Sequence, residues 1–146
     1  IRREMTMIEI ISGEKGKGKT KELLNKVNTS ITSATGNIVY LDKRQKHMYE
    51  LNNKIRLINV NDFLIDNCDE FLGFICGVIS QDHDLEEMYL DSFLTIASID
   101  SDELLNHAIQ KLDVISEKYN VKFILSVSKD ESKLTDIAKA KIVISL

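Results

Sequence analysis

The sequence "GEKGKGKT", residues 13–20, places three glycines and three lysines within eight positions. It follows the apolar run "MIEIIS" and precedes "KELLNKVNTSI", where apolar residues recur at helical spacing. A glycine-rich turn between a strand and a helix can hold an anion, because its backbone N–H groups and the helix N-terminus point into the same space. The alternative is a flexible, positively charged turn, and the surrounding sequence has to distinguish the two.

Every required position of the pattern Gly-x-x-x-x-Gly-Lys-Ser/Thr is filled in this stretch. Gly13 and Gly18 allow backbone angles and a close approach to a ligand that a side chain would block. Lys19 is predicted to reach the terminal phosphates of a nucleotide, and the Thr20 hydroxyl to bind Mg²⁺. ATP or another nucleoside triphosphate, with Mg²⁺, is therefore the predicted ligand. The predicted binding residues are Gly13, Glu14, Lys15, Gly16, Lys17, Gly18, Lys19, Thr20 and Lys21. The lysines other than Lys19 raise the local positive potential, although solvated lysines that only aid solubility explain each of them as well.

Apolar runs of strand length recur along the chain, and several are almost continuously apolar, which is typical of strands buried on both faces of a parallel sheet. They span residues 7–12, 37–42, 55–60, 87–91, 121–128 and 141–146. Helical patterns lie between most of them. Strands that alternate with helices predict a three-layer α/β sandwich with a mainly parallel sheet.

Three apolar stripes mark the longer predicted helices. The first helix ends before Gly36, and its stripe is Leu23, Leu24, Val27 and Ile31. The stripe of the second is Cys68, Phe71, Leu72, Ile75 and Ile79. Asp100 is predicted to cap the third, with Glu103 three residues on. Its stripe is Leu105, Ala108, Ile109, Leu112 and Tyr119. A short last helix is predicted over residues 134–138, whereas residues 42–55 are too short for a full crossover helix.

The composition predicts one folded domain over residues 5–146, because 43% of the 146 residues are hydrophobic and 29% are charged. Residues 1–4 are assigned to a cloning vector or to an upstream start. A formal net charge of −4 argues against a nucleic-acid partner, since phosphate backbones attract clustered positive charge. Cys68 and Cys76 match no metal or redox spacing and are predicted to be reduced core residues.

The longest apolar run, "FLGFICGVI", has nine residues, which is too short to cross a bilayer. No segment has the basic, apolar and small-residue order of a signal peptide. The sequence therefore predicts no membrane insertion and a cytoplasmic location.

Two aspartates that end predicted strands complete the predicted site, because the carboxyl ends of parallel strands meet at the edge where the glycine stretch lies. Asp91, at the end of "EMYLD", is predicted to position Mg²⁺ together with Thr20 and to act in catalysis with Lys19. A helix cap or a loop residue is the alternative for Asp91. Asp42, at the end of "NIVYLD", is predicted to orient or deprotonate the attacking water. For Asp42 the alternative is a turn aspartate.

Weaker candidates surround these residues. Ser126 and Ser128 end a strand, where they would sense the terminal phosphate or act as caps. Arg44 and Arg56 are candidate arginine fingers, with an ion pair as the favoured interpretation of each. The acidic run at residues 81–87 is predicted to be a solvated loop, since its single histidine lacks a second ligand at metal-binding spacing.

The chain resembles the P-loop NTPase superfamily over residues 5–146. It is most similar to small uncharacterised bacterial P-loop proteins labelled twitching motility protein PilT or ATP-binding protein. Besides the glycine stretch, the resemblance rests on "YLDSF", "EFLGFICGVISQDHDLEEMYLD" and "EKYNVKFILSVS". It implies the fold of P-loop containing nucleoside triphosphate hydrolases and a nucleotide-binding core. It does not imply a pilus motor, because pilus-retraction ATPases are much longer and carry further acidic and histidine motifs.

Three functions from different classes remain open. The first is a Mg²⁺-dependent ATPase whose nucleotide state moves a loop near residues 42–54 and so controls an unidentified protein partner. The second is a small-molecule, nucleoside-type kinase, since "GKTKELLNKV" and "YLDSF" faintly resemble thymidine kinases, although the catalytic glutamate and cysteine-bearing lasso of that family are not visible. The third is a nucleotide-binding module without turnover.

Two departures narrow these alternatives. In many ATPases a glutamate directly follows the magnesium-positioning aspartate, whereas this chain has Ser92, which argues against fast hydrolysis and favours the module. Membrane-associated partitioning ATPases carry an additional lysine where this chain has Glu14, so that group is set aside. The expected function is ATP binding with slow or partner-stimulated hydrolysis.

Overall fold

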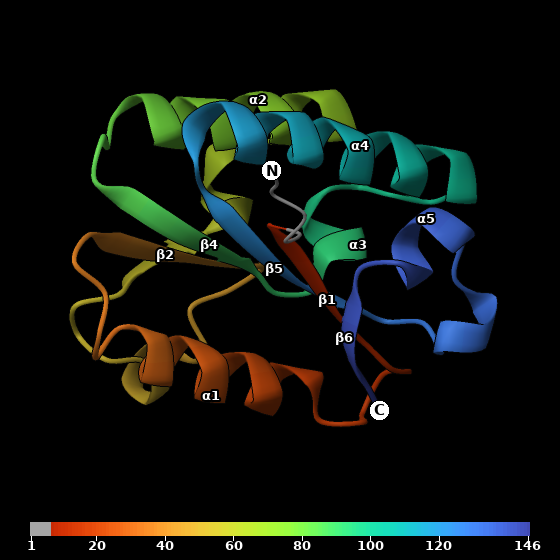
Figure 1. Ribbon diagram of the computed structural model, residues 1–146, viewed down its shortest axis with the longest axis horizontal. Coiled ribbons are helices and arrows are strands. Elements are labelled where there is room, and N and C mark those ends of the chain that lie inside the picture. Colours follow the sequence, from red (N-terminus) through yellow and green to blue (C-terminus); the bar gives the residue numbers. More distant parts are fainter. Residues whose placement is uncertain (1–6) are drawn as a thin grey trace, which may run out of the picture.

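Six strands form one all-parallel sheet in the computed structural model, which describes residues 7–146 (Figure 1). Their order across the sheet is β3-β2-β4-β5-β1-β6. The strands are β1 (Ile8–Ser12), β2 (Asn37–Asp42), β3 (Arg56–Asn59), β4 (Leu85–Leu90), β5 (Lys122–Val127) and β6 (Ile142–Ser145). The predictions for residues 1–4 and for a domain start at residue 5 fall outside the described residues.

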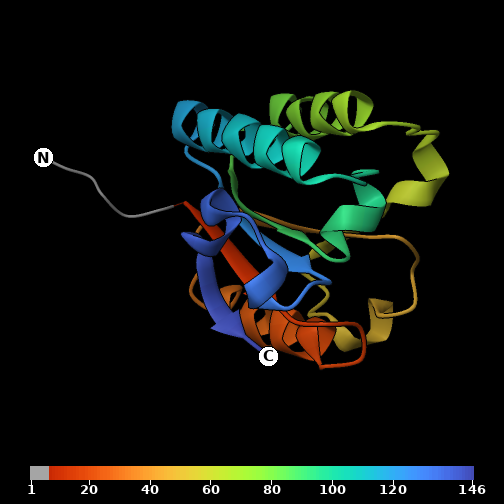
Figure 2. The same ribbon diagram turned by 90° about the vertical axis from the view of Figure 1, so that its right-hand side faces the viewer.

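Helices cover both faces of this sheet, as Figures 1 and 2 show. On one face lies α1 (Lys19–Ser30), while α2 (Cys68–Ser80) and α4 (Asp102–Tyr119) lie side by side on the other. The shorter elements are α3 (Phe93–Ile96), α5 (Asp136–Lys139) and the 3₁₀ turns η1 (Met48–Glu50), η2 (Val60–Phe63) and η3 (Glu131–Lys133). None of the helices formed by residues 7–146 has both the length and the apolar character needed to span a bilayer.

The two faces of the sheet contribute to two separate apolar clusters, because successive side chains of a strand point to opposite faces. Ile10 and Leu41 pack in the cluster beneath α2 and α4. Their chain neighbours Ile11 and Tyr40 pack in the cluster beneath α1. Both sets are buried, which explains why the strand sequences are almost continuously apolar.

The predicted architecture is confirmed at the level of an α/β fold with a parallel sheet between helices. All six predicted strands form, and the helix after the glycine stretch ends at Ser30, before Gly36. Among helices and strands, residues 43–55 contain only the turn η1, as expected for a connection too short for a crossover helix. Cys68 and Cys76 are both free, but only Cys68 is buried.

Three local predictions are wrong. The residue that caps α4 is Ser101 rather than Asp100, because Ser101 has extended backbone angles and its hydroxyl accepts the N–H three residues later at 3.1 Å. Tyr119 is 46% exposed as the last residue of α4, and Ile115 occupies the buried stripe instead. The acidic run is only partly a loop, because residues 85–87 begin β4 and pair with β2.

Candidate functional site

The register of the sheet aligns three polar residues at one edge. One row of the sheet contains Leu41, Leu90 and Leu125, from β2, β4 and β5. The residues that follow this row are therefore neighbours, and they are Asp42, Asp91 and Ser126. Side chains alternate along a strand, so these three face the α1 side of the sheet, as Tyr40 does. Adjacent strands lie about 4.8 Å apart, which brings the two buried carboxylates close to each other.

The glycine stretch forms the turn between β1 and α1. Gly16 and Gly18 have φ angles of 88° and 96°, in the left-handed region that residues with a side chain rarely adopt. A Cβ atom at either position would meet nothing within 4 Å, so the need for glycine is conformational rather than steric. Gly18 is the N-cap of α1 and makes no side-chain hydrogen bond to the first N–H groups of this helix. N–H groups without a cap at a helix N-terminus are suited to hold an anion.

Lys19 is the first residue of α1 and is buried against the turn. Its Nζ donates a hydrogen bond to the backbone oxygen of Glu14 at 3.0 Å. Burial lowers the pKa of Lys19, while the charge of Asp91 acts in the opposite direction. A partly buried ammonium on a neutral carbonyl would gain from a charged partner such as a phosphate oxygen.

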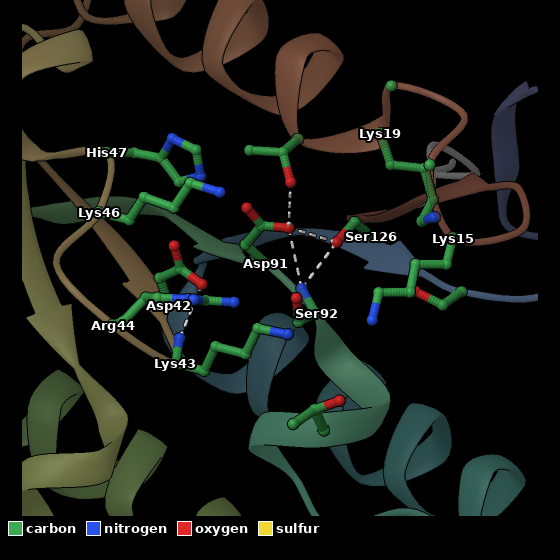
Figure 3. Close-up of a pocket in the computed structure, with 15 residues that line it drawn as sticks. Lys15, Lys19, Asp42, Lys43, Arg44, Lys46, His47, Asp91, Ser92 and Ser126 are labelled. Carbon is green, nitrogen blue, oxygen red and sulfur yellow. Dashed lines mark hydrogen bonds between the residues drawn. The ribbon is translucent and has the colours of Figure 1, made fainter.

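Asp91 is the point at which four elements converge. Its Oδ1 accepts hydrogen bonds from Ser126 Oγ at 2.7 Å, from Ser92 N at 2.9 Å and from Thr20 Oγ1 at 3.2 Å (Figure 3). Its Oδ2 accepts the hydroxyl of Tyr40 at 2.8 Å. Asp91 does hold the first N–H after its strand, as a loop aspartate would, but the three hydroxyls give its carboxylate a fixed orientation.

Asp42 combines the features of a turn residue with those of a candidate base. Its Oδ1 accepts the N–H of Lys43 at 2.7 Å, which is the turn interaction. Burial raises the pKa of Asp42, and the charge of Asp91 raises it further, against the opposing effects of Lys43 and His47. A carboxylate with increased proton affinity beside a reacting group is suited to accept a proton.

These residues share one pocket with a volume of about 500 Å³ (Figure 3). Lys15 and Lys19 lie on one side of it. We call residues 43–55, which connect β2 to β3, the β2–β3 loop. This loop contributes the basic residues on the opposite side, which are Lys43, Arg44, Lys46 and His47. Asp91 lies between the two groups, and Asp42 lies on the side of the loop, beside Lys43 and Arg44.

Four residues of the predicted nucleotide site do not line this pocket, namely Gly13, Glu14, Lys17 and Lys21. Glu14 contributes only the backbone oxygen that Lys19 contacts, and its own side chain is exposed. Lys17 and Lys21 are also exposed, which fits the interpretation of solvated lysines. Lys15, Gly16, Gly18, Lys19 and Thr20 do line the pocket.

The weaker candidates separate clearly. Arg44 lines the pocket. Arg56 is the first residue of β3, whereas Asp42 pairs with Asn59, the last residue of that strand. Neither arginine forms an ion pair with a residue in the described part of the chain, so the ion pairs expected for them are absent there. Ser126 and Ser128 both line the pocket, and Ser126 bonds to Asp91.

The oxygen donors of Thr20 and Asp91 fit Mg²⁺. They lie 3.2 Å apart, and Mg²⁺ prefers hydroxyl, carboxylate, water and phosphate oxygens, with only one or two ligands from the protein. Residues 7–146 contain no group of three or more His, Cys, Asp or Glu side chains arranged to hold a metal ion. A Mg²⁺ ion in this pocket would complete its shell with water and phosphate oxygens.

Sequence reasoning missed Tyr40 and the lysines of the β2–β3 loop. Tyr40 lies inside a buried strand, and a buried tyrosine hydroxyl normally has a hydrogen-bond partner, which was the available signal. Lys43 and Lys46 follow Asp42 within four residues, but nothing in their spacing shows that the loop turns back toward the glycine stretch.

A comparison of the sequence with protein-family models found no match, and neither did a comparison with curated proteins.

Proposed function

We propose that the chain binds a nucleoside triphosphate, with ATP the first candidate, together with Mg²⁺, and hydrolyses it slowly or when stimulated by a partner. The observation that carries this proposal is the 3.2 Å contact between Thr20 and Asp91, which are 71 residues apart in sequence. Together with the strand, glycine turn and helix that precede Thr20, it supports membership of the P-loop NTPase superfamily.

The residues have separate roles in this proposal. The turn at Gly16 and Gly18 and the N-terminus of α1 would hold phosphate oxygens through backbone N–H groups. Lys19 would exchange the carbonyl of Glu14 for a terminal phosphate. When bound, Mg²⁺ would neutralise charge that develops on the phosphates.

We expect slow turnover because Ser92 stands where many ATPases have a glutamate, which leaves Asp42 as the candidate base. Asp42 is the candidate that would orient an attacking water and accept its proton, since burial and the charge of Asp91 raise its pKa. Ser92, which follows Asp91, has no side-chain base to offer. A binding module without turnover is the second candidate function, and Ser92 is the observation that favours it.

Calorimetric titration of ATP, ADP and GTP in the presence of Mg²⁺ tests the binding proposal. We expect wild type to bind at micromolar to millimolar concentration and Lys19→Met, which keeps most of the buried stem, to lose at least about tenfold in affinity. Lys21→Met is the matched control, because Lys21 is exposed and lies outside the pocket. If wild type binds no nucleotide at millimolar concentration, the proposal is wrong.

A phosphate-release assay then separates the two candidate functions. Slow release that is lost in Asp42→Asn, with nucleotide affinity retained, supports hydrolysis through Asp42. Tight binding without any release supports the module.

A further inference from the structure

The β2–β3 loop brings positive charge into the pocket on the side opposite the glycine turn. Lys43, Arg44 and Lys46 line the pocket, and none of them has a carboxylate partner within 4.0 Å in residues 7–146. Figure 3 shows Lys43 and Arg44 extended toward the middle of the pocket. The loop therefore presents cations that no carboxylate of the described residues neutralises by direct contact.

Hydrogen bonds at both ends fix this loop over the pocket. At its start, Asn61 Nδ2 donates to the backbone oxygen of Lys43 at 2.6 Å. At its far end, Asn28 of α1 donates to the backbone oxygen of Glu50 at 2.8 Å and accepts the N–H of Asn52 at 2.9 Å. Asn28 belongs to α1, the helix that begins directly after the glycine turn. The same helix is therefore hydrogen-bonded to the loop and continuous with the predicted phosphate turn.

The glycine turn and its lysines can hold a nucleotide without help from the loop cations. A triphosphate that shares its charge with Mg²⁺ satisfies the lysines beside the glycine turn, Lys15 and Lys19. Asp42 offsets part of the charge of Lys43, as the effect of Lys43 on the pKa of Asp42 indicates. Arg44 and Lys46 are exposed at the pocket wall and remain available to an anion.

We propose that the β2–β3 loop forms a second anion site, which binds the phosphate group of a second small-molecule ligand while a nucleotide occupies the glycine turn. This inference rests on the proposed nucleotide binding. Arg44 supplies a planar guanidinium that can donate two parallel hydrogen bonds to phosphate, and Lys43 and Lys46 supply point charges. The rest of such a ligand would face Asp91, which lies between the loop cations and the lysines of the glycine turn.

The competing explanation is that the same cations contact the terminal phosphate of the nucleotide itself. The two explanations differ in what a loop variant loses. A second site loses affinity for the second anion alone, whereas a nucleotide contact loses affinity for the nucleotide.

Calorimetry with two successive ligands tests the proposal. The protein is first saturated with Mg²⁺ and a non-hydrolysable ATP analogue, so that the terminal phosphate position is filled, and inorganic phosphate is then titrated. The loop variant combines Arg44→Gln with Lys46→Gln. Its matched control combines Arg56→Gln with Lys111→Gln, which removes the same charge from exposed residues outside the pocket.

We expect phosphate to bind the loaded wild type and the control alike at millimolar concentration. In the loop variant we expect its Kd to rise at least about tenfold, while the Kd of the analogue changes less than about threefold. Three results would overturn the second site: no phosphate binding to the loaded wild type, equal losses in the loop and control variants, or an equal loss of analogue affinity in the loop variant. Failure of the analogue to bind wild type would instead overturn the nucleotide proposal, and the second site with it.

Discussion

Removal of the Tyr40 hydroxyl tests whether the sheet orients Asp91 for the bound ligand. Tyr40 is fully buried in β2, and its hydroxyl donates to Asp91 Oδ2 at 2.8 Å. Burial and the charge of Asp91 raise the pKa of Tyr40 far above its usual range, so the phenol remains a proton donor throughout ordinary assay conditions. Tyr40→Phe removes this donor and leaves the ring in place.

The expected loss follows from the type of hydrogen bond. A bond to a charged acceptor contributes about 1.5–3 kcal/mol, and no cavity forms because the ring still stacks on Tyr89 with centroids 6.2 Å apart. A loss of about 2 kcal/mol lowers the Tm of a chain of this size by about 4–8 °C. A residue that orients a metal-positioning carboxylate typically costs about 10–100-fold in metal affinity when it is removed, so Mg²⁺-dependent nucleotide binding should weaken by that factor.

Tyr89→Phe is the matched control for this prediction. It removes a hydroxyl that donates to Glu87, rather than to Asp91, at 2.8 Å, from a ring in the same cluster. Thermal unfolding followed by circular dichroism measures the stability of both variants, and calorimetry at several Mg²⁺ concentrations measures nucleotide binding. Both variants should lose stability, but only Tyr40→Phe should require more Mg²⁺. An equal Mg²⁺ requirement in the two variants would refute the orienting role of Tyr40.

Two further predictions concern stability without ligand. Asp42→Asn should raise the Tm at neutral pH, because the pKa of Asp42 is higher in the folded than in the unfolded chain and its charge therefore destabilises the fold. This destabilisation grows as the pH rises from the unfolded-state pKa toward the folded-state pKa. In thermal unfolding scans at several pH values, the gain in Tm should vanish below about pH 4. Gly18→Ala should cost about 1–2 kcal/mol, because φ at this position is 96°. Gly73→Ala, at a position inside α2 where a Cβ atom meets nothing within 4 Å, should instead raise the free energy of unfolding by up to about 1 kcal/mol. Chemical denaturation measures both changes, and a change of the same sign in the two glycine variants would contradict this account.

The α/β architecture was predictable from the sequence because the strands and the longer helices carry their own periodic signals. Continuous apolar runs identified the buried strands, and stripes at helical spacing identified the helices. The cap of α4 was predicted wrongly because two neighbouring residues compete for one role. Asp100 and Ser101 are both good helix caps, and only the backbone angles of the folded chain select Ser101.

The site was predictable only where a residue follows a recognisable element. Asp42 and Asp91 each follow a predicted strand, so their position at one edge could be expected from a parallel sheet. The contact of Tyr40 with Asp91 depends on strand order and register, since β2 must lie directly beside β4. Arg44 and Arg56 look equivalent in the sequence, and the turn of the β2–β3 loop toward α1 is what separates them.

The pocket concentrates three features that oppose folding. Lys19 holds a partly buried ammonium on a neutral carbonyl, Asp42 and Asp91 place two buried carboxylates side by side, and the first N–H groups of α1 have no side-chain cap. Each feature has a free-energy cost in the free chain, and at Asp42 a neutral replacement is expected to recover part of it. A phosphate would relieve the ammonium and the N–H groups, and a divalent cation would relieve the carboxylates. One ligand that carries both therefore accounts for all three features, which neither a flexible basic turn nor an isolated anion site does.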